Sequence, residues 1–255
     1  MPELPVSART ALWTTHAWSG AMPLEDALRR ATPDLDLVAG GLETLRAWAQ
    51  LGEQALLLGT AAPGDLSRLP GCDAEAAAAA AEAGECVFVA GVGGMLVPAV
   101  TPFGTGSGLD GGWRVDWQAW PAAPIARHRV EALDAGQVER TLRQALLEAS
   151  QELEVTGGQP FLGRTSRALA EDSLATAWAL PEGIPPRALS ATRLAATVSQ
   201  LCRAGLDGHD DALDAATAGR RRALLLRLER VAEQGLADAV NAGCAALAGW
   251  VPARR

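Results

Sequence analysis

The fold is decided by the stretch Cys86–Val100, CVFVAGVGGMLVPAV. Two apolar runs, 86–90 and 95–100, flank the turn Gly91-Val92-Gly93-Gly94. Apolar runs of this length on either side of a glycine-rich turn predict a β-hairpin. The uncharged stretch continues to Leu109, but its glycines and prolines would leave backbone polar groups unsatisfied in lipid. We therefore expect strands in a folded core and no membrane span.

The sequence on both sides of this hairpin predicts a mixed sheet with helices around it. Residues 113–118 alternate strictly, with Trp113, Val115 and Trp117 on one face, which is typical of a half-exposed antiparallel strand. Upstream, apolar spacing and capping signals predict helices at 6–19, 23–30, 42–51 and 73–83 and strands at 35–39 and 54–59. We expect the run 54–59, QALLLG, to be a central strand, joined to 35–39 by a parallel, right-handed crossover.

Past Pro124 the pattern becomes helical. Asp134 and Gln137 form a capping-box pattern that opens a helix to about Leu153. Further helices are predicted at 165–178, at 190–204 after a Ser190 cap, and from 210 to 248 with a break near Gly219 or Gly235. The predicted class is α+β, with a small mixed β-sheet and flanking helices in residues 1–125 and a helical half in residues 126–255. Whether the two halves are separate domains or one cooperative unit stays open at this stage.

Composition excludes several chemistries. All 22 basic residues are arginines, tyrosine is absent and Asn241 is the single asparagine, a pattern typical of a high-GC bacterial genome. Without lysine there is no P-loop, protein-kinase or Schiff-base site. A net charge of −8 opposes binding to nucleic acid. The four cysteines show no C-x-x-C pair and the N-terminus shows no secretory signal, so we expect reduced, mostly buried thiols in a cytoplasmic protein without a cofactor.

The first candidate site is the loop after the run 54–59. Ligands in open α/β sheets bind beyond the carboxyl ends of strands, so Asp65, Ser67 and Arg68 would line a small-molecule pocket there. The competing interpretation is a plain surface turn with an Asp65–Arg68 pair.

The second candidate is a metal site. His209, Asp210 and Asp211 place an imidazole beside carboxylates, which together can hold one divalent ion for a metal-dependent hydrolase. The competing interpretation is an interhelical turn whose aspartates cap the next helix.

Two further patterns have plain interpretations that we favour. The glycine runs 91–94 and 104–108 do not fit the spacing of a dinucleotide loop or a nucleophile elbow, and are better explained as turn and loop sequence. For the loop 102–112, a lid or a recognition loop stays open as the alternative to a plain linker. Trp113, Trp117 and Trp120 are better explained as core or interface packing than as a stacking platform.

The functional prediction follows from the absence of a complete catalytic constellation. We expect a non-catalytic interaction or assembly protein that binds a protein partner or itself, in the latter case as a homodimer that presents helix faces or the tryptophan-bearing sheet. The alternatives are a small-molecule binder or enzyme at Asp65, Ser67 and Arg68, and a metal-dependent hydrolase at His209 and Asp210.

Overall fold

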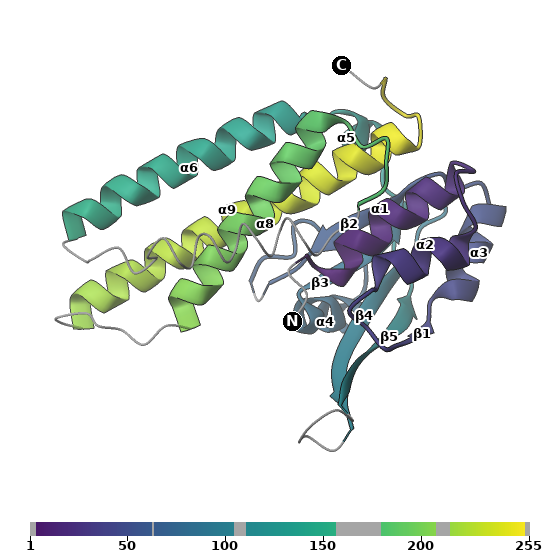
Figure 1. Ribbon diagram of the computed structural model, residues 1–255, viewed down its shortest axis with the longest axis horizontal. Helices are drawn as coiled ribbons and strands as arrows, with labels where there is room; N and C mark the ends of the chain where they lie inside the picture. Colours follow the sequence, from purple (N-terminus) through teal and green to yellow (C-terminus); the bar gives the residue numbers. More distant parts are fainter. Residues whose placement is uncertain (1–3, 63, 105–110, 157–179, 208–214, 253–255) are drawn as a thin grey trace. The chain divides into compact units, whose positions relative to one another are not determined.

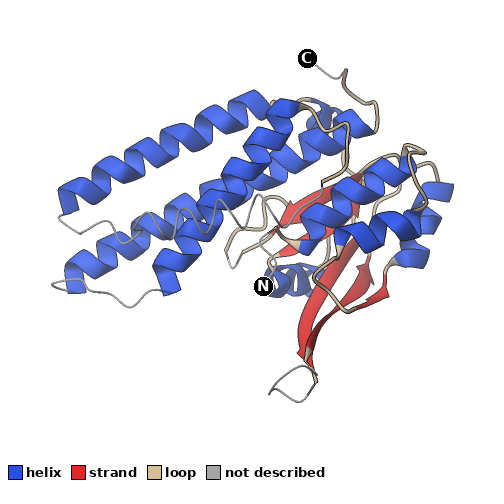
Figure 2. Ribbon diagram, viewed as in Figure 1, coloured by secondary structure: helices blue, strands red, loops and turns tan. Residues whose placement is uncertain are grey.

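The computed structural model describes residues 4–62, 64–104, 111–156, 180–207 and 215–252. The chain forms two compact units. One contains the described residues of Pro2–Leu133, Ala179–Pro185 and Val240–Arg255, and the other those of Asp134–Trp178 and Pro186–Ala239. The first unit carries the sheet and the second is helical, so the predicted α+β class is confirmed (Figure 2).

The sheet unit follows the predicted order of elements closely. Its helices and strands, in chain order, are α1 (Val6–Trp18), α2 (Leu24–Ala31), β1 (Leu37–Gly40), α3 (Leu42–Gln50), β2 (Leu56–Thr60), α4 (Ala74–Ala83), β3 (Glu85–Val89), β4 (Met95–Phe103), β5 (Gly112–Trp120) and the short α5 (His128–Glu131).

The five strands form one sheet in the order β1-β5-β4-β3-β2. β1 pairs with β5 in parallel, and the other neighbours are antiparallel, so the sheet is mixed as predicted. The predicted parallel crossover between the first two strands is wrong, because β1 and β2 lie at opposite edges of the sheet. The run 54–59 supplies an edge strand rather than a central one, yet Leu56, Leu57 and Leu58 are fully buried. Its apolar character reflects burial, which the sequence reveals, and not its place in the strand order.

The hairpin and the alternating strand are confirmed. β3 and β4 pair across the 91–94 turn, with Val87 opposite Leu96. In β5, Val115 and Trp117 are buried while Arg114 and Gln118 are exposed. β4 and β5 continue together past the rest of the sheet as a long two-stranded arm, seen in teal in Figure 1.

α4 shows how local sequence sets a helix. The Asp73 carboxylate accepts a hydrogen bond from the Ala76 backbone N–H at 2.8 Å, and Gly84 ends the helix in the left-handed region. Both signals were predicted from the sequence. The alanine-rich segment between them packs on β3 and β4 through the small side chains of Ala76 and Ala80.

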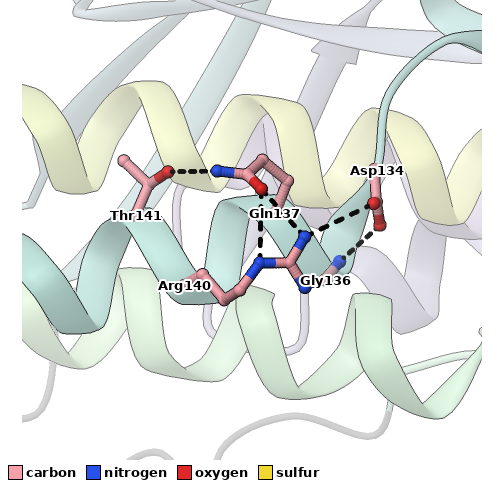
Figure 3. Close-up of polar contacts among 5 residues, drawn as sticks. All are labelled: Asp134, Gly136, Gln137, Arg140 and Thr141. Carbon is pink, nitrogen blue, oxygen red and sulfur yellow. Dashed lines mark hydrogen bonds and ion pairs between the residues drawn. The ribbon is translucent and has the colours of Figure 1, made fainter.

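The helical unit contains α6 (Ala135–Thr156), α8 (Pro186–Asp207) and most of α9 (Ala215–Leu247). At the start of α6, the Asp134 carboxylate accepts from the Gly136 N–H at 2.9 Å (Figure 3). The Gln137 side chain instead contacts Arg140 and Thr141 along the helix. Asp134 is thus the predicted cap, but the reciprocal half of the capping box is absent from these contacts.

Two predicted helix boundaries change. α8 begins at Pro186, in the first-turn position that proline tolerates, and Ser190 lies inside the helix with its hydroxyl bonded to Glu139. α9 is continuous, so the predicted break at Gly219 or Gly235 is wrong. A Cβ at Gly235 would lie 3.2 Å from Leu142, so this glycine allows close helix packing rather than a kink. The predicted helix at 165–178 lies outside the described residues.

Candidate functional site

The loop that holds Asp65, Ser67 and Arg68 is ordered by its own side chains. One oxygen of the Asp65 carboxylate accepts from the Ser67 N–H at 3.1 Å and from the Ser67 hydroxyl at 2.7 Å. The backbones of Ala62 and Asp65 exchange two further hydrogen bonds, at 2.9 and 3.0 Å. The Arg68 carbonyl lies 3.2 Å from the position of a Cβ at Gly59, so the loop folds back onto the end of β2. The structure brings the three residues together as a side-chain-stabilised turn, and a ligand there stays a prediction.

The glycine turn 91–94 is already occupied by groups of the protein. The buried Glu53 carboxylate accepts a hydrogen bond from the Val92 N–H. The Gly94 N–H donates to the Ala122 carbonyl at 2.9 Å. Two of the N–H groups that an anion cradle would use are therefore engaged in fixing the β3–β4 turn. The Glu53 contact was not predicted from the sequence.

The predicted metal ligands His209, Asp210 and Asp211 lie outside the described residues. Within the part of the chain that the structure describes, no three His, Cys, Asp or Glu side chains gather closely enough to hold a metal ion. Among the same residues, no helix combines the length and apolar character that a membrane crossing needs.

The β2 edge of the sheet is sealed by two side chains. The Thr15 hydroxyl accepts from the Leu56 N–H at 2.9 Å and donates to the Leu56 carbonyl at 3.3 Å. The Asn241 amide does the same for Leu58, accepting from its N–H at 2.7 Å and donating to its carbonyl at 2.9 Å. An edge strand otherwise presents unpaired backbone groups, so these side chains take the place of a sixth strand.

The β1 edge is open, in that no strand of the described part of the chain lies on its outer side. The Asp36 N–H donates to the Trp113 carbonyl at 2.9 Å, which sets the alternation of the parallel ladder. The Trp113 N–H also points toward β1, so Val115, two residues on and opposite Val38, faces β1 as well. In a parallel ladder the backbone groups of Leu37 and Ala39 then face β5, and the N–H and C=O of Val38 point away from the sheet. The side chains of Leu37 and Val38 are 50% and 43% exposed. β1 carries no lysine, proline or inward charge of the kind that usually protects an edge strand.

Both ends of β1 are held firmly in place. The buried Arg9 guanidinium forms a two-contact ion pair with Asp34, just before the strand. The Asp36 carboxylate accepts from the Trp113 N–H at 2.9 Å. After the strand, Gly40 has φ +69°, and a Cβ there would lie 2.5 Å from the Trp117 carbonyl oxygen. A side chain at position 40 would collide with β5, so the turn that ends β1 requires glycine. The contacts at its two ends therefore hold β1 in one position beside β5.

Charged groups lie next to the open edge on β5. Arg114 is opposite Leu37 and Asp116 is opposite Ala39, and the two charged side chains form an ion pair at 2.6 Å. Register partners in a sheet share a face, so Leu37, Ala39, Arg114 and Asp116 lie on the same face. Phe103, on β4, is a further large apolar side chain in this region, 39% exposed.

Beneath the other end of the sheet, Glu85 of β3 serves as a remote cap for α1. Pro5 at the helix start offers no side-chain cap, and the Glu85 carboxylate accepts from the Ser7 N–H at 2.8 Å. Burial raises the pKa of Glu85, and the hydrogen bonds from Ser7 and the nearby Arg9 charge oppose the rise. We therefore assign the Glu85 carboxylate a structural role, the capping of the buried helix α1.

The tryptophan candidates lie in or beside the sheet. Trp117 is buried and Trp113 and Trp120 are half-buried, which fits packing at the sheet. In the helical unit, Glu229 and Glu233 both bind Arg203, at 2.9 and 2.8 Å.

Sequence reasoning missed the structural difference between the two edges of the sheet. Asn241 stood out as the single asparagine, and it lies close in sequence to the buried apolar residues Ala237, Ala239, Val240 and Cys244. A lone amide in a buried helix stripe signals a specific buried partner. The sequence could not identify that partner as Leu58.

Comparison with known proteins gives matches to two family models. Residues 7–133 match the model described as "Rv1486c-like protein, N-terminal domain", and residues 136–237 match "Rv1486c-like protein, C-terminal domain". No curated protein matches the chain. No solved structure matches it either.

Proposed function

The chain belongs to the two-domain Rv1486c-like protein family, and we propose that it acts as a non-catalytic interaction or assembly protein. The observation that carries this proposal is the open β1 edge, where Leu37 and Val38 are exposed and no strand among the described residues pairs with the outer side of β1. Exposed main-chain donors and acceptors on a fixed strand are suited to binding another extended chain.

The difference between the two edges supports the proposal. Thr15 and Asn241 satisfy the β2 edge completely at Leu56 and Leu58, so the fold has the means to close an edge. Leaving the opposite edge open exposes the protein to unwanted pairing. A function in binding explains why that hazard is kept.

The engagement of candidate catalytic groups also supports it. Asp65 is bonded to Ser67 within its own turn, and Glu53 is bonded to the Val92 N–H. These carboxylates stabilise loops, and a general acid or base must instead reach a substrate.

A thermal-shift screen tests the proposal against the two enzymatic alternatives. Divalent metals and nucleotides bind the folded state only if a site exists, and binding raises the melting temperature. We expect no saturable shift with any of these ligands. A large saturable shift that disappears in Asp65→Ala or His209→Ala, but persists in the exposed control Glu75→Ala, would overturn the non-catalytic assignment.

A further inference from the structure

We propose that one face of α1 binds a row of ordered water molecules inside the sheet unit. Among the residues that the structure describes, six buried side-chain nitrogen or oxygen atoms have no hydrogen-bond partner, and five of them belong to this one helix. Four of the five are Ser7 Oγ, Thr10 Oγ1, Thr14 Oγ1 and Trp18 Nε1. Buried polar atoms without a partner are rare in folded proteins, so their concentration on one helix requires an explanation.

The four atoms belong to one face of the helix. Residues 7, 10, 14 and 18 are three or four positions apart, and side chains at these spacings lie one above another along a helix. The face is closed to a macromolecular partner, because eleven of the thirteen residues of α1 are buried and Thr10 and Thr14 are 1% and 0% exposed. An occupant must therefore be small enough to fit inside a packed fold.

The hydroxyls on this face are not bonded to their own helix. A serine or threonine in a helix commonly donates to the carbonyl four residues earlier. Ser150 on α6 and Thr197 on α8 do so, both at 2.9 Å. The Thr10 and Thr14 hydroxyls form no such bond, so a partner outside the helix backbone is needed to satisfy them.

Water matches the spacing and the chemistry of the row. Side chains on successive turns of a helix have Cβ atoms about 5–6 Å apart. A direct hydrogen bond between hydroxyls needs about 2.8 Å, whereas one water between Thr10 and Thr14 can bond to both. Water also accepts from the Trp18 N–H, which can only donate. A buried water needs two to four polar partners, and neighbouring members of the row supply them.

The row runs from a buried carboxylate toward the protein surface. At its start, the Ser7 N–H donates to the Glu85 carboxylate at 2.8 Å, and a carboxylate can accept further hydrogen bonds from water. At its end, Trp18 is followed by the exposed residues Ser19 and Gly20. The waters therefore extend the solvation of Glu85 along α1. This inference does not depend on the proposed interaction function.

A high-resolution crystal structure of the full chain is the direct test. We expect water oxygens within about 2.7–3.2 Å of Thr10 Oγ1 and of Thr14 Oγ1. No water should lie against the side chain of Leu57, which is fully buried and apolar and serves as the control. Protein groups bonded to both threonine hydroxyls, or no ordered water beside either, would overturn the inference.

Removing a hydroxyl distinguishes a hydrated face from a dry one. Valine keeps the shape of threonine without its hydroxyl, so Thr14→Val takes a partner from the waters and should lower the Tm by about 2–4 °C. At a dry face the same change removes an unpartnered buried hydroxyl, and an unchanged or raised Tm would contradict the proposal. Thr32→Val is the matched control, since the buried Thr32 hydroxyl donates to the Leu28 carbonyl at 2.9 Å and its loss lowers the Tm with or without water.

A double variant tests whether the two hydroxyls share a water. Thr10→Val and Thr14→Val together should lower the Tm by less than the sum of the two single changes, because the second change acts on a water that has already lost a partner. Thr14→Ser keeps the hydroxyl and should keep the water in a crystal structure. Fully additive losses, or a water that is absent from Thr14→Ser, would count against a shared row.

Discussion

The Asn241 amide, near the end of α9, binds both the N–H and the C=O of Leu58 in β2, 183 positions earlier in the chain. The last residues of α9 therefore belong to the sheet unit, together with the N-terminal half of the sequence. An amide has one donor and one acceptor side by side, so it copies the edge of a neighbouring strand. This relationship makes the C-terminal segment part of the N-terminal fold.

Replacing this amide should destabilise the protein strongly. Asn241→Ala leaves the Leu58 N–H and C=O buried without partners, and we expect a loss of about 2–4 kcal/mol in the free energy of unfolding. Urea denaturation followed by circular dichroism measures the loss. Gln144→Ala, which removes an exposed amide from α6, should cost under about 0.5 kcal/mol. Equal costs for both variants would contradict the sealing role of Asn241.

The Glu85 cap should give the unfolding free energy a defined pH dependence. The pKa of Glu85 is raised in the folded state, chiefly by burial. Its contribution to stability is therefore fully present below the ordinary carboxyl pKa and is lost as the pH rises through the raised value. Glu85→Gln keeps an acceptor for the Ser7 N–H and removes this loss.

The measurement is the difference in unfolding free energy between Glu85→Gln and the wild type from pH 4 to pH 8. We expect the variant to gain relative to the wild type as the pH rises. The exposed control Glu82→Gln should show no such trend. A difference that stays flat, or that grows in favour of the wild type, would refute the assignment.

In the helical unit, Arg203 should stabilise the fold by linking two helices. Its guanidinium joins α8 to α9 by binding Glu229 and Glu233, whose side chains are only 16% and 24% exposed. Removing it takes the guanidinium away from two partly buried carboxylates, so Arg203→Ala should lose about 1–2 kcal/mol of unfolding free energy. Arg203→Lys should recover part of the loss, because an ammonium lacks the planar fork. A cost for Arg203→Ala no larger than that of the exposed Arg193→Ala would argue against the bridge.

The four cysteine thiols should differ in how fast they react with a thiol-specific reagent. Cys86, Cys202 and Cys244 are buried, and burial raises the pKa of Cys202 and of Cys244 to about 12. Cys72 is half-buried, so it is the most accessible of the four, although burial raises its pKa as well. Since the thiolate is the reactive form, we expect one fast-reacting thiol per folded chain and four after unfolding. Cys72→Ser should abolish the fast phase, and a fast phase that survives this change would show that another thiol is accessible.

Local patterns predicted most elements of the sheet unit because short-range physics sets them. Asp73 and Gly84 bound α4, and the alternation of residues 113–118 gives the buried and exposed faces of β5. Strand order escaped prediction for a physical reason. The apolar run 54–59 predicts a buried strand but not what buries it. A neighbouring strand and the helices α1 and α9 would both require the same apolar residues, so the pattern cannot distinguish a central strand from an edge strand.

The candidate sites divide in the same way. The Asp65 turn was visible because aspartate and serine two residues apart bond locally. The contact of Glu53 with Val92 joins residues 39 positions apart, and no local signal encodes it. The outward backbone groups of Val38 depend on which strands lie beside β1, which is set by pairing between distant segments.

By itself, the sequence determined the α+β class, the helical second half, the positions of most helices and strands, and the absence of lysine-based chemistry. Those properties follow from composition and from periodicity over a few residues. The tertiary structure alone decided that β2 is an edge, that Thr15 and Asn241 seal it, and that β1 remains open. Backbone groups carry no side-chain signature of their partners, so only the assembled sheet reveals which of them are satisfied and which are left to bind.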